Sequence, residues 1–312
     1  MPLAFWQDTG NAVRLVLPVP HPLTFGLMGF PQTAPYGRMV DQWRRAEAMG
    51  FDSVFVADET PMEFPGAIGY EAWSLLGAIA CETTRVRIGT LVTPITFRHP
   101  LLLAMSVSTV DHISNGRVIV GIGAGGGGKD EAGVGVNFTP GERVDRLEEQ
   151  LAVLDRLLRG ETVTKEAGHY RMTDAVIEPP IQRPRPPILV AAQGPRGLRI
   201  AARYADIWNS LGGQPAFGEA LSFADAVAAT REQVERLEDA CQSIGRDPSS
   251  IGRSVFVYRY KTYASPNALV EYVGRYRELG FDQFIVAWPS IAEREAVLEQ
   301  VAAEVLPRLR AS

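Results

Sequence analysis

Residues 187–210 read PILVAAQGPRGLRIAARYADIWNS and predict a strand, a turn, a helix and a second strand in succession. Ile188 to Val190 form the kind of apolar run that is typical of a parallel strand covered on both faces. Gly194 and Pro195 then start a helix, because proline at the first helical position lacks an N–H and glycine lets a ligand approach the backbone. The free N–H groups and the dipole of that first turn suit a phosphate group. Two interpretations stay open for this stretch alone, a docking site for a phosphorylated cofactor or an ordinary connection between a strand and a helix.

The composition is typical of a globular protein with either one large domain or two of average size. The chain has 312 residues, of which 46% are hydrophobic and 21% are charged. A net charge of -5 offers no electrostatic attraction to nucleic acid or to an anionic membrane. Two cysteines, Cys81 and Cys241, are too few for a disulfide framework. Because we find no leader peptide and no apolar run long enough to cross a bilayer, we expect a cytoplasmic protein.

Segments with strand-like and helix-like patterns alternate from residue 24 to the C-terminus, about eight of each. This alternation predicts an α/β fold, a (β/α)₈ TIM barrel with loop insertions. A doubly wound open sheet is the alternative, but it needs a topological switch point that no residue marks. We therefore expect one barrel domain, residues 24–312, preceded by an extension, residues 1–23. The expected strands are 24–30, 53–57, 86–92, 117–123, 188–190, 205–210, 254–260 and 283–287.

Helix boundaries are marked by capping residues. Thr139 to Glu142 and Ser290 to Glu293 have the spacing of a capping box, in which two side chains bond the free N–H groups of the first turn. Further helices are expected at 36–49, 100–113, 217–244 and 266–280, and 162–176 is expected to be a hairpin. One short motif occurs twice, as Gly-Phe-Asp at 50–52 and again at 280–282, in each case between a helix and a strand.

The carboxyl ends of barrel strands are where a TIM barrel places its ligands. This rule selects Asp58 and Glu59 after the second strand, where either carboxylate could act as an acid or a base. Otherwise the strand ends supply bare backbone, amide and apolar groups, and such a surface suits a large planar cofactor that brings its own reactivity. The four histidines show no metal-ligand spacing, so no metal site is predicted. The remaining strand-end candidates are Met28, Phe30, Thr93, the Gly123 to Gly128 loop, Ala192 to Gly194, Asn209, Tyr260, Lys261 and Trp288.

The chain from about Thr24 onward resembles the bacterial luciferase-like flavin and deazaflavin oxidoreductases. The resemblance rests on GFDSVFVADE at 50–59, TRVRIGTLVTPITFRHP at 84–100, DHISNGRVIVGIGAG at 111–125, GHYRMTDA at 168–175 and PILVAAQGPRGLRIAARYADIWN at 187–209. It implies a (β/α)₈ barrel that binds FMN or coenzyme F420. It also implies a non-proline cis peptide near Leu91-Val92 and a phosphate site at the start of the helix at Pro195. The expected cofactor-binding residues are Leu91, Val92, Thr93, Gly123, Ala124, Gly125, Ala192, Gln193, Gly194 and Pro195.

Two departures from that resemblance bear on the mechanism. Relatives that use F420 on sugars resemble this chain at Asp58, but they carry histidine in place of Glu59 and a glutamate near Gly126. These departures speak against a hydride transfer that uses the same groups as in those relatives. The catalytic candidates in this chain are Glu59 and, beside it, Asp58, for either monooxygenation or hydride transfer with a small organic substrate. The substrate is expected to be selected by the variable loops at 61–67, 126–138 and 211–217.

Several alternatives remain open from the sequence. A barrel that binds a flavin without turnover would also explain the scarcity of acid and base groups. A lyase that forms a Schiff base through Lys261 is a different chemical class. For the favoured enzyme, the expected partners are a small-molecule substrate, a separate flavin or F420 reductase, and a second copy of the chain in a homodimer.

Overall fold

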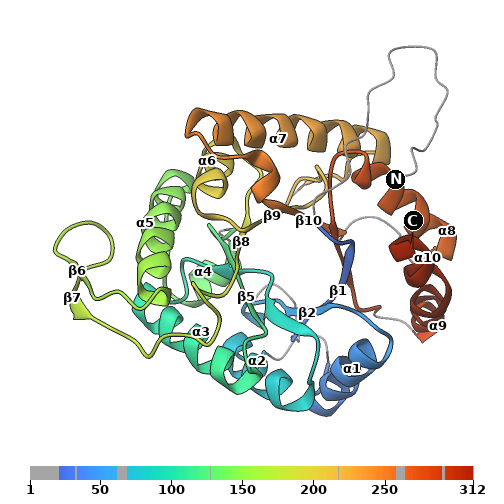
Figure 1. The fold of residues 1–312 in the computed structure, drawn as a ribbon, viewed down its shortest axis with the longest axis horizontal. Helices are drawn as coiled ribbons and strands as arrows, with labels where there is room; N and C mark the ends of the chain where they lie inside the picture. Colours follow the sequence, from blue (N-terminus) through green and yellow to red (C-terminus); the bar gives the residue numbers. More distant parts are fainter. Residues whose placement is uncertain are drawn as a thin grey trace.

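The computed structural model of the chain describes residues 21–31, 34–61, 69–126, 128–216, 218–257, 264–289 and 292–311. Eight parallel strands close into a barrel, since β1 pairs with both β2 and β11, and β3 pairs with β5. The predicted (β/α)₈ barrel is confirmed, and Figure 1 shows its ring of helices around the strands. The strands are β1 (Thr24–Gly29), β2 (Ser53–Val56), β3 (Arg87–Thr90) with its short continuation β4 (Thr93–Pro94), β5 (Val118–Gly123), β8 (Ile188–Ala191), β9 (Ile207–Ser210), β10 (Gly252–Val257) and β11 (Gln283–Ala287).

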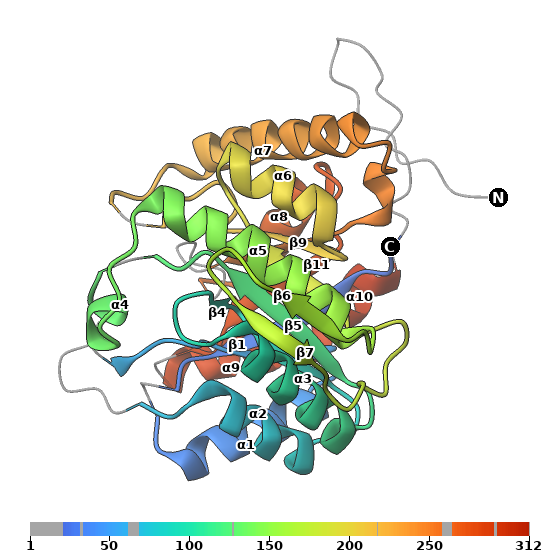
Figure 2. The ribbon, with the colours of Figure 1, turned by 90° about the vertical axis from the view of Figure 1, so that its left-hand side faces the viewer.

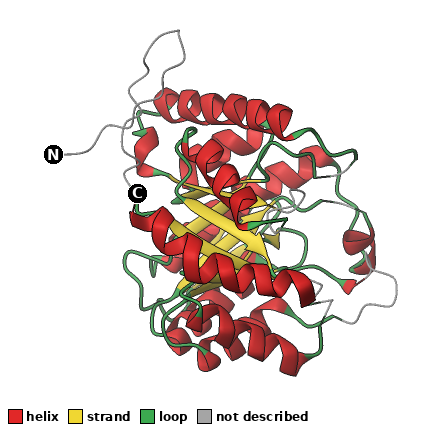
Figure 3. Ribbon diagram, turned by 90° about the vertical axis from the view of Figure 1, so that its right-hand side faces the viewer, coloured by secondary structure: helices red, strands yellow, loops and turns green. Residues whose placement is uncertain are grey.

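A helix follows each barrel strand and covers its outer face, as Figure 3 shows from the side. Between β5 and β8 the chain also forms an antiparallel hairpin of β6 (Val163–Lys165) and β7 (Met172–Ala175), which confirms the predicted one. The barrel helices are α1 (Tyr36–Ala48), α2 (Ala72–Glu82), α3 (Pro100–Ser114), α5 (Pro140–Leu158), α6 (Pro195–Tyr204), α7 (Phe223–Ser243), α8 (Pro266–Arg277) and α9 (Ala292–Gln300). Shorter elements are α4 (Lys129–Gly133), the 3₁₀ turn η2 (Pro248–Ser250), the π-helical turn η3 (Val301–Val305) and α10 (Leu306–Ala311).

Side chains at the helix starts agree with the capping arguments. The Thr139 hydroxyl accepts a hydrogen bond from Glu142 N at 3.2 Å, and the Glu142 carboxylate accepts one from Thr139 N at 2.8 Å, which completes the predicted capping box of α5. The prediction for α7 was wrong by six residues, since the helix begins at Phe223 after Ser222, whose hydroxyl accepts from Asp225 N. The capping box at 290–293 and the extension at 1–23 lie largely outside the described residues, so both stay predictions.

Two hydrophobic clusters divide the core. The larger cluster fills the layer between the barrel and its helices, while a smaller one lies inside the barrel and includes Met28, Phe55, Leu91 and Ile285. Side chains alternate between these layers along each strand because successive residues point to opposite faces. The barrel is therefore a packed body, and its open carboxyl end is the place where a ligand can lie.

The repeated Gly-Phe-Asp motif has a structural explanation at the amino ends of the strands. Asp52 accepts a hydrogen bond from Phe25 N at 2.8 Å, and Asp282 accepts one from Arg253 N at 3.3 Å. Asp206 does the same for Ile188 N at 2.8 Å. In each case an aspartate just before one strand bonds a free N–H at the start of its neighbour. The motif thus supplies hydrogen-bond acceptors to free N–H groups at the face of the barrel opposite the ligand end.

Asp282 predicts a pH dependence of stability. Burial raises its pKa from 3.8 to about 6, with Arg253 and His21 acting in the opposite direction. A carboxyl group whose pKa is raised in the folded state destabilises the fold when it is ionised. The stability that the protonated form contributes is therefore present below about pH 4 and is lost as the pH rises through about 6. We expect Asp282→Asn to raise the free energy of unfolding at pH 7.5 by up to about 3 kcal/mol, with a smaller gain as pH falls toward 4. Urea unfolding at several pH values measures this.

Asp52→Asn is the matched control, because Asp52 occupies the equivalent position but pairs with Arg310 at 2.6 Å on the surface. We expect its effect to stay within about 1 kcal/mol. An Asp282→Asn protein whose stability follows the wild-type pH curve would contradict the assignment.

Candidate functional site

The carboxyl end of the barrel has an apolar floor that is only partly covered. Met28, Ala57 and Leu91 are buried there, whereas the neighbouring apolar side chains are half-buried and pack against them. This end lies on the side from which α4 projects in Figure 2. Partly exposed apolar groups at the ligand end of a TIM barrel are typical of surfaces that bind a ligand. The half-buried side chains are Phe30, Val92, Leu211 and Ala287.

The glycines of β5 let the neighbouring segment approach its backbone. A Cβ on Gly121 would lie 1.8 Å from the carbonyl oxygen of Thr90, and one on Gly123 would lie 2.7 Å from Cγ2 of Val92. Gly125 has φ +81°, and a Cβ there would lie 2.9 Å from a carboxylate oxygen of Glu131. The small residues expected to contact a ring therefore also serve packing against β3 and the following loop. The Leu91-Val92 peptide is cis, as the resemblance implies.

Thr93 is the centre of a buried hydrogen-bond network. Its hydroxyl donates to Oδ2 of Asp58 at 2.7 Å and accepts from Nε1 of Trp73 at 3.0 Å. The Thr90 hydroxyl lies 3.0 Å away and donates to the carbonyl of Gly121 at 2.9 Å. Thr93 as a whole is fully buried, so its hydroxyl acts within the protein and not on a dissolved substrate.

Asp58 lies in the same network, paired with Arg98. Arg98 donates to both carboxylate oxygens, from Nη1 to Oδ2 at 2.5 Å and from Nη2 to Oδ1 at 3.1 Å. Burial raises the pKa of Asp58, although the charge of Arg98 and the hydrogen bonds from Arg98 and Thr93 act to lower it. For Arg98, burial lowers the pKa, yet the charges and hydrogen bonds of Asp58 and Glu71 outweigh it and raise the pKa overall. These two directions disagree, and we assign the ionised pair because a proton on either Asp58 oxygen would face a donor.

The two catalytic candidates therefore occupy different environments. Asp58 is 5% exposed and directs both oxygens toward protein donors. Glu59 is exposed at the end of β2. Of the two, Glu59 is the one that a dissolved substrate could reach. Lys261 lies outside the described residues, so the lyase alternative stays a prediction.

The α6 start is the second part of the candidate site. Pro195 is the first helical residue, and Gly194 before it makes no side-chain cap. Within the described chain no acceptor is recorded for the N–H groups of Arg196 and Gly197, so these donors are available to a ligand. Trp208 is fully buried and donates from Nε1 to the carbonyl of Ala192 at 2.8 Å, which holds the loop in place.

Side chains around the β5–α5 connection add further polar atoms. Gln150 is fully buried, and its Oε1 accepts from the Tyr170 hydroxyl at 3.0 Å. The Arg146 guanidinium lies 3.9 Å from the centre of the Phe138 ring. Three buried atoms here, Oγ1 of Thr96, Nε of Arg146 and Nε2 of Gln150, have no hydrogen-bond partner among the residues that the structure describes. Buried polar groups of this kind are normally bonded, so a ligand or water is expected beside them.

Sequence reasoning missed Arg98, Glu71 and Trp73. Arg98 directly precedes the predicted helix at 100–113 and lies in one of the stretches that carry the resemblance, but neither pattern assigns it a role. Its pairing with Asp58 spans 40 residues and has no local pattern. A carboxylate at a strand end signals a need for a partner, but nothing in the sequence identifies which arginine supplies it.

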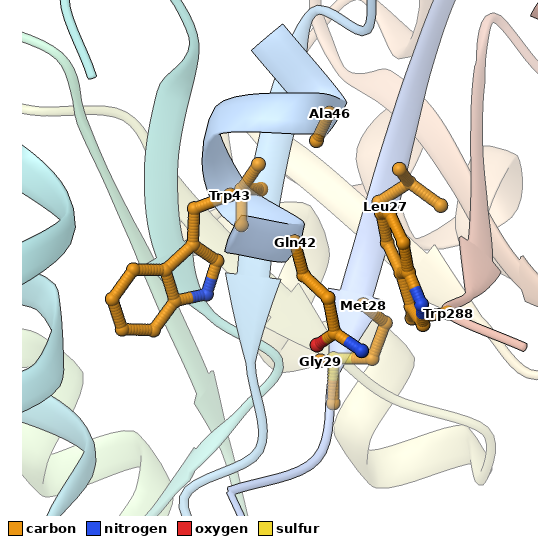
Figure 4. A pocket seen from close by; sticks show the side chains of 8 residues that line it. Leu27, Met28, Gly29, Gln42, Trp43, Ala46 and Trp288 are labelled. Atoms are coloured by element: carbon orange, nitrogen blue, oxygen red, sulfur yellow. The ribbon is translucent and has the colours of Figure 1, made fainter. Parts of the chain in front are cut away.

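A separate crevice lies outside the barrel wall, between α1 and β1. Figure 4 shows Gln42 and Ala46 of α1 on one side and Leu27 with Trp288 on the other. None of the predicted catalytic or cofactor-binding residues lines it. The crevice is therefore not the predicted site.

Two absences apply to the described residues alone. Within these ranges no group of three or more His, Cys, Asp or Glu side chains is placed to hold a metal ion. In the same part of the chain no helix is both long enough and apolar enough to cross a membrane.

Comparisons with known proteins identify the family to which the chain is similar. A family model for luciferase-like monooxygenases matches residues 20–260. An F420-dependent glucose-6-phosphate dehydrogenase of Microbacterium testaceum is 30% identical over 93% of this chain and 98% of the relative, and one of Intrasporangium calvum is 31% identical over 87% and 94%. In structure, the coenzyme F420-dependent tetrahydromethanopterin reductase of Methanopyrus kandleri matches with a TM-score of 0.76 at 18% identity, covering 92% of this chain and 99% of the other.

The chain belongs to the luciferase-like monooxygenase family. The predicted class, an oxidoreductase that works with a flavin-type cofactor, FMN or F420, is confirmed at this level.

Proposed function

We propose that this protein is an F420-dependent oxidoreductase that transfers a hydride between its cofactor and a small alcohol or carbonyl compound. The observation that carries this proposal is the similarity, along almost the whole chain, to dehydrogenases whose names specify F420. FMN is the other cofactor of the predicted class. The test below separates the two.

The residues at the barrel end fit such a cofactor in two places. The half-buried floor around Val92 and Gly123 would contact the apolar ring, and the start of α6 at Gly194 would bind the phosphate. Oγ1 of Thr96, which has no partner within the described ranges, lies next to Gly125 near the apolar floor and could bond a polar edge of the ring. When bound, F420 supplies the hydride acceptor or donor of the reaction.

Glu59 is the residue we propose as the acid or base. An alcohol that loses a hydride from carbon must also lose its hydroxyl proton, and an exposed carboxylate at the strand end can accept it. Asp58 cannot fill that role while both of its oxygens are bonded to Arg98 and Thr93. The histidine that sugar-oxidising relatives carry at position 59 suggests that this chain acts on a different substrate of the same chemical class.

The test is an anaerobic assay of F420 reduction with glucose 6-phosphate, free glucose and a series of secondary alcohols. We expect turnover with at least one hydroxyl substrate. Glu59→Gln should lower kcat about 100-fold while the Kd for F420 stays within about threefold, because general base catalysis contributes to the chemical step and not to cofactor binding. Glu232→Gln, on the exposed face of α7, is the control and should behave as wild type.

Two outcomes would overturn parts of the proposal. Equal kcat in Glu59→Gln and wild type would remove Glu59 from the mechanism. Oxygen consumption with reduced FMN, together with no reaction of F420, would indicate a monooxygenase, with a separate reductase as its expected partner.

We also propose a homodimer, which light scattering of the purified protein tests.

A further inference from the structure

We propose that Arg98 is a positioning residue, which acts through Asp58 and Thr93 to hold the ring-facing segment Leu91 to Thr93 at the barrel end. The inference rests on the proposed function, since it assigns a role in cofactor binding. It differs from a catalytic role, because no atom of Arg98 is needed at the reacting groups.

The first step of the argument is the rigidity of the contact. The Arg98 guanidinium bonds Asp58 through both of its terminal nitrogens, and a planar two-point contact fixes orientation as well as distance. Asp58 Oδ2 also accepts from the Thr93 hydroxyl at 2.7 Å. The side chains of Asp58 and Arg98 are 5% and 16% exposed, so water competes little for these bonds.

The second step is that the contact completes a closed hydrogen-bond network, which joins three separate parts of the chain. Arg98 also pairs with Glu71, whose carboxylate caps α2 by accepting from Ser74 N at 2.7 Å. Trp73, in the first turn of that helix, donates from Nε1 to the Thr93 hydroxyl at 3.0 Å and so completes the network. The end of β2, the start of α2 and the loop before α3 are thereby tied to one hydroxyl group.

The third step connects this hydrogen-bond network to the cofactor site. Thr93 directs its side chain into the network, whereas Val92 beside it is half-buried in the apolar floor. A Cβ on Gly123 would already lie 2.7 Å from Val92 Cγ2, so Val92 is packed closely against the backbone of β5 and cannot move further toward it. A shift of Thr93 would therefore displace Val92 against the place where the ring is expected.

The experiment compares matched variants in two measurements. Fluorescence titration gives the Kd for F420, and thermal unfolding gives the stability of the apoprotein. Thr93→Val keeps the shape of the side chain but removes the hydroxyl, while Thr93→Ser keeps the hydroxyl. Arg98→Lys keeps the charge but loses the two-point contact. Arg44→Lys is the control, because Arg44 forms an exposed ion pair with Glu82 on the outer helices.

We expect Arg98→Lys and Thr93→Val to raise the Kd for F420 at least tenfold and to alter the absorption band of the bound cofactor. Thr93→Ser and Arg44→Lys should bind within about threefold of wild type. The double variant Asp58→Asn with Arg98→Met removes both charges, so it should unfold at a temperature close to that of wild type yet still bind weakly. That combination separates positioning from a loss of folding.

The outcomes discriminate between the two proposals. Wild-type protein that binds no F420 would contradict the proposed function. Wild-type protein that binds F420, with an unchanged Kd and spectrum in Arg98→Lys and Thr93→Val, would overturn the positioning role. Full recovery of binding in the neutral double variant would also overturn it, because the pair would then contribute only to stability.

Discussion

Replacing Gly194 with aspartate is expected to weaken cofactor binding at least 100-fold while leaving the fold as stable as wild type or slightly more stable. Gly194 precedes α6 with φ −86° and ψ 161°, and a Cβ there would meet no atom within 4 Å. Aspartate is among the preferred N-cap residues, so its carboxylate should bond the N–H of Arg196 or Gly197. It would thereby take the donors that the phosphate needs and place a negative charge beside it.

The opposite signs of the two effects make this prediction specific. The N-cap bond should add a few tenths of a kcal/mol to stability. A phosphate that the new negative charge excludes from the helix start loses its hydrogen bonds to both N–H groups, at about 1.5–3 kcal/mol each, and together these exceed the roughly 2.7 kcal/mol that a 100-fold loss of affinity requires. Fluorescence titration and thermal unfolding measure both quantities. Gly194→Ala, which adds a side chain without charge, should bind within about threefold of wild type. Unchanged affinity in Gly194→Asp would place the phosphate elsewhere.

We expect Gly121→Ala to prevent folding, whereas Gly123→Ala should fold but bind the cofactor more weakly. At Gly121 the added Cβ would lie 1.8 Å from the Thr90 carbonyl oxygen, which belongs to the backbone of β3 and cannot move without opening the barrel. We expect Gly121→Ala to yield no cooperative unfolding transition. At Gly123 the obstacle is the Val92 side chain at 2.7 Å, which can turn toward the barrel opening. Gly123→Ala should therefore fold, with a cost of about 1–3 kcal/mol, and bind F420 about tenfold more weakly.

A compensating substitution tests this explanation. Val92→Ala removes the group that the new methyl would meet, so the double variant Val92→Ala with Gly123→Ala should recover part of the lost affinity and stability. Chemical denaturation and cofactor titration of the four proteins in this cycle measure the coupling. Strictly additive effects would show that the two side chains do not interact.

The barrel itself could be predicted because its signals are local. Buried strands such as β5 consist of continuous apolar residues, and the predicted strand ends that lie in the described residues fell within about two residues of the observed ones. Helix starts at Pro100, Thr139 and Pro195 were placed correctly, because proline and the capping box act on the first turn alone. The start of α7 was not, since the loop before it has several glycines and no strong apolar periodicity.

The site could be predicted only in part, for a physical reason. Its backbone features, such as the glycines of β5 and the α6 start, follow from residue types at strand ends. The state of Asp58 does not, because it depends on Arg98 and Thr93, which the fold brings to it from 35 to 40 residues away. A strand-end carboxylate is equally compatible with proton transfer and with an internal ion pair, and only the three-dimensional contacts distinguish them.

The central claim is that the barrel end binds F420, and equilibrium titration of the purified protein with F420, reduced F420, FMN and reduced FMN tests it most directly. The Trp residues and the cofactor fluorescence both report binding. We predict saturable binding of F420, with a Kd at least tenfold lower than that of FMN in the matching redox state. Binding of none of the four would contradict the account, and it would return attention to Lys261, which borohydride trapping with a carbonyl substrate would then examine.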